Sequence, residues 1–272
     1  MANAQMTNHQ LPFTANEIAR GLQTQTLGRR IIFHERIGST NDAAKQLADA
    51  NEAEGTVVIA DEQTAGRGRL GRAWIAPPHS SILMSIILRP TLAPRQASRV
   101  MMAVALGACE AIRAETGLDA QIKWPNDLAV RGKKLAGILS ESGIVGDKLE
   151  YVIAGIGVNV NFSATAVTGI PSDATTIADE LGTSFSRVRL VQALLTEIEK
   201  YYARIDEDLR AEYCPRCVTL NQLVRSRTPH GFIEGVADGV NENGALLLRR
   251  ADGVLMELLA GDVTLSPKGN QP

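Results

Sequence analysis

The feature that most constrains the fold of this chain is a series of three strand-like segments between residues 120 and 162. They read AQIKWPNDLAV, KKLAGILSES and LEYVIAGIGVNVNF. Short turn sequences interrupt or separate them, namely Pro125-Asn126-Asp127, Arg131-Gly132 and Val145-Gly146-Asp147. Strand-like runs joined by such short turns are typical of antiparallel neighbours. The sequence therefore predicts an antiparallel meander in this part of the chain.

The segments before this meander predict three further strands and two helices. The runs RIIFHERI, GTVVIADEQ and SSILMSIILRP are rich in β-branched or apolar residues, which favours strands. Apolar residues at helical spacing predict one helix near residues 41–50, with Ser39 or Thr40 as its cap, and a second over 98–117 that ends at Gly117. Residues 1–30 are polar and weakly patterned, and we interpret them as a leader.

The last part of the chain changes character. Apolar residues from Val188 to Ile205 recur at helical spacing and predict one long amphipathic helix from Ser186 to about Tyr213. After about Val218, short apolar runs alternate with Asn/Gly and Asp/Gly turns, which is typical of a small all-β barrel of roughly 50 residues. We therefore predict an α+β domain over residues 31–216 and a small β-domain over residues 217–268.

The composition argues against several classes of protein. The formal net charge is −2 and 21% of the residues are charged, which argues against general adhesion to nucleic acid or to an anionic membrane. No apolar run approaches the roughly 20 residues that a bilayer crossing needs, and the N-terminus lacks the pattern of a signal peptide. The expected location is cytoplasmic, and any basic site must be local.

The three cysteines do not predict a disulfide or metal framework. Cys109, Cys214 and Cys217 are an odd number and too few for such a framework in a chain of 272 residues. Cys214-Pro-Arg-Cys217 has the spacing of a redox or zinc half-site, but no second cysteine pair or nearby histidine pair completes four ligands. We interpret these cysteines as structurally incidental.

The segment EQTAGRGRLGRAW, residues 62–74, concentrates three glycines and three arginines between two predicted strands. Gly66, Gly68 and Gly71 match the spacing of the dinucleotide-binding fingerprint. That motif must open a helix, whereas two prolines and then a strand follow here, and no Lys-Ser/Thr follows as in a P-loop. Neither nucleotide motif applies, and the segment is predicted to join strand to strand.

Two interpretations of this Gly/Arg loop, residues 62–74, remain. One is an arginine-rich surface hairpin or an RNA-contacting segment, although the loop lies between hydrophobic strands and Trp74 is the one aromatic residue near it. The other is a phosphate-binding loop, in which glycines allow close backbone approach and arginines neutralise charge that builds up during a reaction. In that case repulsion between the arginines keeps the empty loop mobile, and an anionic ligand orders it.

Five sequence blocks in a fixed order resemble those of one family. They are GSTN (38–41), the Gly/Arg loop, KWPND (123–127), KKLAGIL (133–139) and GIGVNVN (155–161). Over residues 31–266 the chain resembles biotin protein ligase, also called biotin–[carboxylase] ligase or holocarboxylase synthetase. The resemblance implies a mixed, mostly antiparallel sheet with helices, similar to class II aminoacyl-tRNA synthetases, followed by a small SH3-like β-barrel.

The resemblance also implies a two-step reaction. Biotin and MgATP give biotinyl-5′-AMP and pyrophosphate, and a lysine of a biotin carboxyl carrier protein then accepts the biotin. A carboxylate and a triphosphate repel each other, so fixed positive groups and Mg²⁺ must relieve that repulsion. By motif position, Arg69 and Lys134 are expected at the carboxylate and the α-phosphate, with Arg67 and Arg72 closing the loop. Asp127 is the candidate that orients and deprotonates the acceptor lysine, whose free pKa is about 10.4.

The family pattern also assigns the residues that bind the two substrates. Biotin has an apolar tail and a ureido group that needs both donors and acceptors, so its pocket should pair those polar atoms. The biotin-binding residues are Ser39, Thr40, Asn41, Gln63, Gly66, Arg67, Gly68, Arg69, Lys134, Gly137 and Gly155. The ATP-binding residues are Arg69, Arg72, Trp74, Asn126, Lys134 and Asn159. No metal ligand is assigned.

Several of these residues also have purely structural explanations. Ser39 and Thr40 can act only as caps of the following helix. The glycines of the last two predicted strands can simply permit close strand packing, and they are Gly137, Gly155 and Gly157. Lys134, with its neighbour Lys133, can belong to a solvated turn, and Asp127 can be a turn residue. Trp124 is expected in the core.

Two features depart from the family pattern. Bifunctional members carry an N-terminal helix-turn-helix domain, which residues 1–30 are too short to form, so we expect no repressor function. Some relatives reach ATP with an arginine after the last strand of the small barrel, where this chain has Ser266. The resemblance therefore does not supply a nucleotide contact from the C-terminal domain.

Two other functions are weighed against the ligase. A lipoate–protein ligase shares the fold family, but GRGRLGR together with KWPND favours biotin. A nucleic-acid-binding regulator would use the Gly/Arg loop as its contact surface. We expect neither nucleic acid nor a membrane as a partner, and the sequence leaves open whether the chain forms a homodimer.

Overall fold

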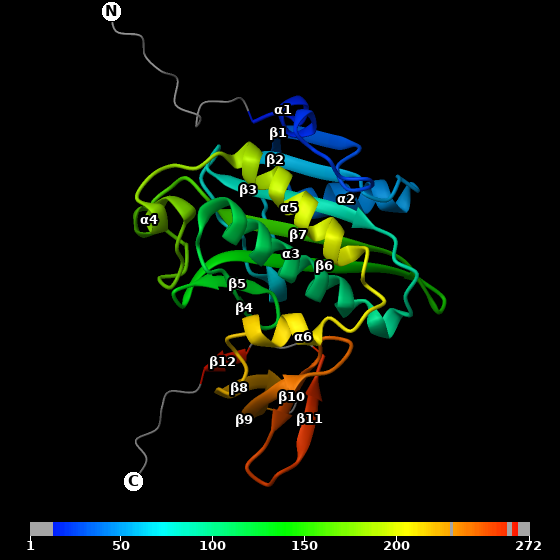
Figure 1. The fold of residues 1–272 in the computed structure, drawn as a ribbon, viewed down its shortest axis with the longest axis vertical. Helices are drawn as coiled ribbons and strands as arrows, with labels where there is room; N and C mark the ends of the chain where they lie inside the picture. Colours follow the sequence, from blue (N-terminus) through cyan, green and yellow to red (C-terminus); the bar gives the residue numbers. More distant parts are fainter. Residues whose placement is uncertain (1–12, 229–230, 260–262, 266–272) are drawn as a thin grey trace, which may run out of the picture.

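The computed structural model describes residues 13–228, 231–259 and 263–265, and its strands form two sheets (Figure 1). The larger sheet contains β1 (Ile31–Ile37), β2 (Val57–Gln63), β3 (Ser81–Leu88), β4 (Gln121–Lys123), β5 (Asp127–Val130), β6 (Lys133–Val145) and β7 (Lys148–Asn159). The smaller sheet contains β8 (Leu223–Thr228), β9 (Gly231–Val240), β10 (Leu246–Arg249), β11 (Leu255–Leu258) and β12 (Val263–Leu265).

The larger sheet is mixed and mostly antiparallel. Its order is β1-β2-β3-β7-β6-β5-β4, and the order of the smaller sheet is β11-β10-β9-β8-β12. Among the described strands, β1 and β2 are parallel to each other and the other neighbours are antiparallel. The predicted α+β fold and the predicted meander, β4 to β7, are both confirmed. All eight residues of β3 are buried, so a polar side chain in that strand needs a hydrogen-bond partner.

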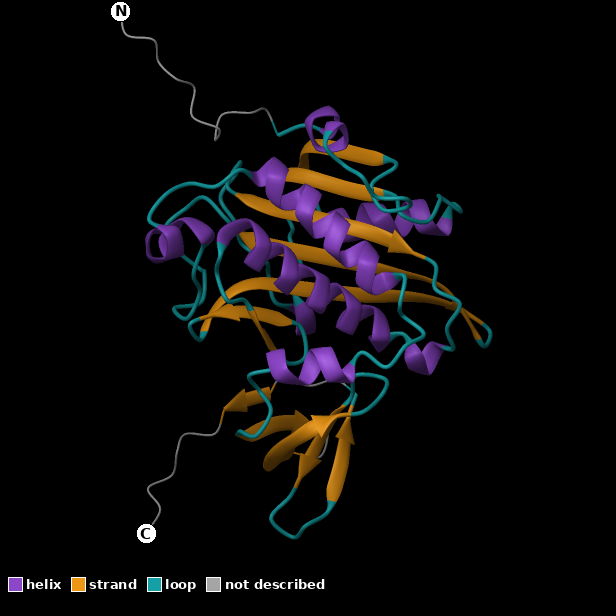
Figure 2. Ribbon diagram, in the orientation of Figure 1, coloured by secondary structure: helices purple, strands orange, loops and turns teal. Residues whose placement is uncertain are grey.

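Helices cover both faces of the larger sheet (Figure 2). The longer ones are α2 (Thr40–Asp49), α3 (Ser98–Thr116) and α5 (Arg187–Tyr202); the shorter are α1 (Ala15–Arg20), α4 (Ile177–Leu181), α6 (Arg210–Tyr213) and the 3₁₀ turns η1 (Arg69–Gly71), η2 (Pro94–Gln96), η3 (Ala164–Ala166) and η4 (Cys214–Arg216). α3 and α5 approach closely at Gly107, where a Cβ would lie 2.6 Å from Ile198 Cα. α2 packs on the opposite face, against Val58 and Ile153. No helix of the described residues is long and apolar enough to span a bilayer.

The single long helix predicted from Ser186 to about Tyr213 is wrong in its second half. α5 begins after Ser186, whose hydroxyl accepts a hydrogen bond from the backbone N–H of Arg189, and it ends at Tyr202. Turns then lead into the short helix α6. Ile205 and Leu209 in those turns are nevertheless buried, so the apolar spacing continues across a break that periodicity cannot reveal.

The described part of the N-terminal segment packs against α5. The side chains of Ile18 and Leu27 are fully buried in the main core. The carboxylate of Glu199 accepts hydrogen bonds from the backbone N–H groups of residues 25–27 at 2.7 to 2.8 Å. Hydrogen bonds to a charged group are the stronger ones, so this helix fixes the chain that leads into β1.

The smaller sheet meets the larger one beside Trp124. The backbone N–H of Trp124 donates to Thr219 Oγ1 and its indole N–H donates to the carbonyl of Gly244, both at 2.9 Å. Trp124 is buried, which confirms the expectation that it belongs to the core. The turn that follows it, Pro125 and Asn126, leads into β5 and therefore begins at this anchored residue. The domain limits at residues 30 and 216 stay predictions.

Candidate functional site

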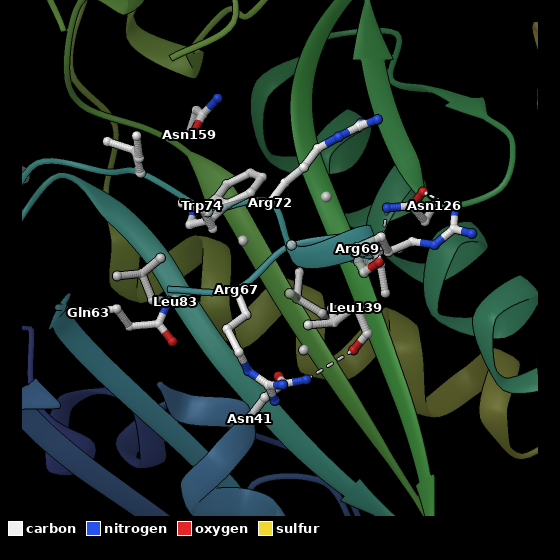
Figure 3. Close-up of a pocket in the computed structure, with 18 of the residues that line it drawn as sticks. Asn41, Gln63, Arg67, Arg69, Arg72, Trp74, Leu83, Asn126, Leu139 and Asn159 are labelled. Carbon is white, nitrogen blue, oxygen red and sulfur yellow. Dashed lines mark hydrogen bonds between the residues drawn. The ribbon is translucent and has the colours of Figure 1, made fainter. Parts of the chain in front are cut away.

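A cleft with about 1110 Å³ of empty space, part of it open to solvent, lies over β3, β6 and β7 (Figure 3). Its walls come from the start of α2, the Gly/Arg loop, the turn before β5, strands β6 and β7, and residues 169–174. Small-molecule sites are typically concave, with apolar side chains and a few polar groups in their lining. The cleft has this character.

Ser39 and Thr40 enter the cleft in a way that the cap prediction did not anticipate. Ser39 occupies the N-cap position of α2, as predicted, but its side chain makes no cap hydrogen bond. Gln63 Oε1, from the end of β2, instead accepts hydrogen bonds from Thr40 N at 2.7 Å and from Thr40 Oγ1 at 3.0 Å. A side chain of the sheet thus satisfies the first backbone N–H of the helix, and all three residues line the cleft.

The amide of Asn41 is held at both ends. Nδ2 donates to Glu141 Oε2 at 2.8 Å, and Oδ1 accepts from the hydroxyl of Ser85 at 2.6 Å. Ser85 pairs with Gly155 across β3 and β7. A Cβ at residue 155 would lie 1.9 Å from Asn41 Oδ1. Gly155 is therefore needed so that this side chain can lie on the strand, and close strand packing alone does not explain it.

The Gly/Arg loop is a tight turn between β2 and β3. Gly68 N donates to the carbonyl of Arg72 at 2.7 Å, and Trp74 N donates to the carbonyl of Gly66 at 2.9 Å. Leu70, at the tip, has φ 57° and is exposed. The predicted strand-to-strand connection is confirmed, and no α-helix opens within this described segment.

Two of the loop arginines reach opposite ends of the cleft (Figure 3). Arg67 Nη2 contacts Asp42 Oδ1 at 2.7 Å and Glu141 Oε2 at 2.6 Å, near the start of α2. Arg69 Nη1 donates to Asn126 Oδ1 at 2.9 Å. Burial lowers the pKa of Arg69, while the charge of Asp127 raises it. Burial disfavours the charged form of a cation, so an anionic ligand close to it stabilises that charge.

Lys134 and Asp127 form an ion pair inside the cleft. Lys134 Nζ, on β6, lies 2.8 Å from Asp127 Oδ1, at the start of β5. Asn126 Nδ2 also donates to Asp127 Oδ1, at 3.2 Å. Both members of the pair are mostly buried and lie in strands, so the solvated-turn explanation for Lys134 and the turn explanation for Asp127 do not hold.

The indole ring of Trp74 packs directly against two glycines, Gly137 on β6 and Gly157 on β7. A Cβ on Gly157 would be 2.5 Å from the indole ring, and one on Gly137 would be 2.9 Å from it. Lys134 Nζ is 5.7 Å from the ring centroid. The indole N–H is buried and has no hydrogen-bond partner among the described residues. Because a buried indole N–H usually finds a partner, this donor is ready for a ligand acceptor.

The structure brings the predicted site residues together, with Gly66 as the exception. Gly66 does not line the cleft, and its carbonyl is used within the loop turn. Asn159 is buried at the end of β7, where its Nδ2 donates to the carbonyl of Thr175 at 3.1 Å. The cleft-lining residues to which the sequence assigned no binding role are Ala73, Ile75, Leu83, Met84, Ile138, Leu139, Ile156, Gly157, Gly169, Ile170, Pro171 and Ala174.

The described residues contain no cluster of three or more His, Cys, Asp or Glu side chains that could hold a metal ion. The three cysteines are free. Burial raises the pKa of Cys109 to about 12, so this thiol is unreactive in the folded protein. Ser266, at the position where some relatives have an arginine, lies outside the described residues.

Comparison with known proteins identifies two matching segments. Residues 33–159 match the biotin/lipoate A/B protein ligase family, and residues 219–266 match the biotin protein ligase C-terminal domain. The bifunctional ligase/repressor BirA of Bacillus spizizenii is 34% identical over 255 residues, which cover 92% of this chain and 78% of the relative. The biotin–[acetyl-CoA-carboxylase] ligase of Mycobacterium tuberculosis is 34% identical over 262 residues, which cover 90% of this chain and 94% of the relative.

Solved structures of the same kind have the same fold. A biotin protein ligase from Aquifex aeolicus in complex with biotin and ATP matches with a TM-score of 0.71 at 27% identity, covering 88% of this chain and 99% of that one. A biotin protein ligase from Leishmania major in complex with biotinyl-5-AMP matches with a TM-score of 0.58 at 27% identity, covering 85% and 99%. The chain belongs to the biotin protein ligase family.

Proposed function

We propose that the chain works as an ATP-dependent biotin protein ligase. It forms biotinyl-5′-AMP and pyrophosphate from biotin and ATP, and it then transfers biotin to a lysine of a biotin carboxyl carrier protein. One observation carries this proposal: a single cleft joins two ends of different character. At one end Thr40, Asn41 and Gln63 offer neutral polar groups and the charge of Arg67 is paired with carboxylates, and at the other end lie Arg69 and Lys134. A molecule with a neutral polar ring at one end and phosphate at the other matches this order.

The end of the cleft around Thr40, Asn41 and Gln63 suits the ureido ring and the apolar chain of biotin. Asn41 and Gln63 have amides and Thr40 has a hydroxyl, so donors and acceptors are both present. Leu83 of β3 lies beside Gln63 in the cleft (Figure 3) and would cover the apolar chain. A buried ureido group costs free energy unless it is hydrogen-bonded, and this wall offers the partners. Ser39 and the backbone of Arg67 and Gly68 complete the proposed biotin site.

The cationic end suits the step that joins carboxylate and α-phosphate. Lys134 and Arg69 are the charges expected at the reacting groups, and Arg72 extends the positive surface toward solvent. Positive charge that is already in place stabilises negative charge that develops on the phosphate. The unpartnered indole N–H of Trp74 and the amides of Asn126 and Asn159 are proposed to meet the nucleotide.

Mg²⁺ is proposed to enter with ATP as part of the substrate. The described residues do not form a cage of carboxylates for a resident ion, and Asp127 is engaged with Lys134. Mg²⁺ keeps several waters and commonly binds through phosphate oxygens and few protein ligands. The donor set of the cleft therefore fits an ion that arrives on the triphosphate.

The Lys134–Asp127 pair provides a route to the transfer step. The acceptor lysine attacks only as a neutral amine, and its free pKa is about 10.4. A phosphate group in the cleft attracts Lys134 away from Asp127, which leaves the carboxylate to hold the incoming amine and receive its proton. Biotin then forms an amide with the lysine and AMP leaves. A homodimer and the lack of a nucleic-acid partner stay predictions from the sequence.

The test is isotope exchange between pyrophosphate and ATP with the purified chain and Mg²⁺. We expect exchange that depends on biotin, followed by AMP release and biotin attachment when a carrier protein is added. Exchange that depends on lipoate and not on biotin would assign the chain to the other branch of the matched family. Salt-sensitive retention of RNA without exchange would indicate a nucleic-acid-binding protein.

A further inference from the structure

Glu141 lies where the fixed wall of the cleft meets the Gly/Arg loop. It is on β6, two residues beyond the KKLAGIL block, and no motif assigns it a role. One oxygen, Oε2, accepts a hydrogen bond from Asn41 Nδ2 at 2.8 Å and from Arg67 Nη2 at 2.6 Å. Asn41 belongs to the biotin end and Arg67 to the loop. A single carboxylate oxygen therefore joins the two.

Two acceptors on β6 fix which way the amide of Asn41 points: Glu141 Oε2 at 2.8 Å and, at the longer distance of 3.3 Å, the carbonyl of Leu139. A carboxylate can only accept, so the NH₂ group of Asn41 must face Glu141. Its carbonyl oxygen then faces Ser85, whose hydroxyl donates to it at 2.6 Å. The Ser85 hydroxyl is also 2.8 Å from Thr40 Oγ1, which contacts Gln63. The orientation set at Glu141 thus fixes the Ser85 hydroxyl, which lies beside Thr40 at the biotin end.

Arg67 attaches the Gly/Arg loop to two carboxylates, those of Asp42 and Glu141. Asp42 Oδ1 lies 2.7 Å from the same Nη2 atom, but the Asp42 side chain is 54% exposed whereas that of Glu141 is 29% exposed. A more exposed ion pair contributes less, because water and salt screen it. Glu141 is also the carboxylate that contacts Asn41. Removing Asp42 should therefore weaken the loop contact only slightly.

We infer that Glu141 is a positioning residue that couples closure of the Gly/Arg loop to the orientation of the Asn41 amide. This inference rests on the proposed function and adds a role in retaining the intermediate. With Arg67 held by Glu141, the loop covers the cleft and biotinyl-5′-AMP stays bound until the acceptor arrives. Without that contact the loop opens more often and the intermediate escapes.

Two substitutions at Glu141 separate its charge from its acceptor atoms. Glu141→Gln keeps an oxygen that can accept from both donors but loses the charge, so it weakens the hold on Arg67 and leaves the Asn41 amide oriented. Glu141→Ala removes both functions. Asp42→Asn tests the more exposed carboxylate. Glu150→Gln is the matched control, since Glu150 is an exposed carboxylate on the neighbouring strand β7.

The measurements are the KM for biotin in pyrophosphate exchange and the rate at which preformed biotinyl-5′-AMP leaves the protein. For Glu141→Gln we expect escape roughly tenfold faster with the KM changed less than about threefold, because a hydrogen bond to a charged group has been weakened. For Glu141→Ala we expect the KM to rise as well, roughly tenfold. Asp42→Asn and Glu150→Gln should stay within about threefold of wild type on both measurements.

A double substitution tests whether Glu141 and Arg67 act as one unit. If they do, Glu141→Gln combined with Arg67→Met releases the intermediate no faster than the faster single variant. The inference is overturned if biotinyl-5′-AMP leaves Glu141→Gln as slowly as it leaves the wild type. It is also overturned if faster release in every variant simply parallels a lower Tm. In both cases the ligase function stands. A wild-type protein that forms no biotinyl-5′-AMP overturns the proposed function, and this inference with it.

Discussion

The cleft has one wall on strands β5, β6 and β7 and another formed by the Gly/Arg loop, and different interactions hold the two walls. Each strand of the first wall is hydrogen-bonded to neighbouring strands on both sides. The face of these strands that is turned away from the cleft belongs to the main core. The loop wall is fixed by hydrogen bonds across its own turn and by contacts of its arginines with Asp42, Asn126 and Glu141. The first wall depends on burial and the second on partly exposed charges.

This difference indicates which steps each wall can perform. A wall built into the core keeps its geometry when a ligand leaves, because moving it would disturb the close packing of the core. A loop held by partly exposed ion pairs opens at a low free-energy cost and responds to an anionic ligand. Groups that need fixed positions, Lys134 and Asp127, lie on the first wall. Covering and release of the ligand fall to the second.

The largest effect is expected from removing the fixed charge of the strand wall. Lys134→Met should lower biotin-dependent pyrophosphate exchange by about 10²–10³-fold, the usual loss for one preorganised group that stabilises developing charge. Lys133→Met is the matched control, because Lys133 is the exposed neighbour and successive strand residues face opposite sides. An equal loss in both variants would mean that the general charge of β6, and not the position of Lys134, supports the reaction.

Asp127→Asn tests the other half of the ion pair. Transfer of biotin from preformed biotinyl-5′-AMP to the carrier should slow by roughly 10²-fold, as for a lost general base, with a smaller change in exchange. A rapid-mixing assay with purified intermediate measures transfer alone. Equal slowing of both steps would mean that Asp127 acts by holding Lys134, and unchanged transfer with a lower Tm would make it a structural residue.

Gly155→Ala tests how strictly the strand wall fixes its neighbours. The added Cβ would lie 1.9 Å from Asn41 Oδ1, so Asn41 must move and its hydrogen bonds must change. We expect the KM for biotin to rise roughly tenfold, the effect of losing about one hydrogen bond. Gly239→Ala, where a Cβ meets its nearest atom at 4.0 Å, controls for replacing a strand glycine. An unchanged KM for biotin in Gly155→Ala would show that Asn41 does not contact biotin.

The strand wall was also the part that the sequence predicted best. The turn residues Arg131 and Gly132 lie between the end of β5 and the start of β6, and both have positive φ in the structure. Local sequence was therefore enough to predict this strand boundary. Helix α5 was predicted too long because Ile205 stays buried beyond its end. Burial and helical geometry are separate properties, and apolar spacing reports only burial.

The predicted site residues are those to which a motif assigns a binding or catalytic role. Residues that contact the cleft only because of how the chain folds were not predicted. Ser85 had one available signal, since it is a hydroxyl within an otherwise apolar run that predicts a buried strand. Residues 169–171 had none, because their place over the cleft depends on the path of the chain between β7 and α4. The position of Ser39 at the helix start was predicted, but the missing cap hydrogen bond was not, because a serine there usually caps. The contact of Gln63, from β2, with the backbone N–H of Thr40 depends on the fold and left no signal in the sequence.

The smallest effect is expected at the tip of the loop. Leu70 is 69% exposed and has φ 57°, a conformation that asparagine adopts more readily than leucine. Leu70→Asn should change the free energy of unfolding by no more than about 0.5 kcal/mol and leave pyrophosphate exchange within about twofold of wild type, since its side chain does not line the cleft. Thermal unfolding and exchange measure these quantities. Slower transfer to the carrier with normal exchange would contradict a passive tip, because only a contact with the acceptor protein would separate the two steps in that way.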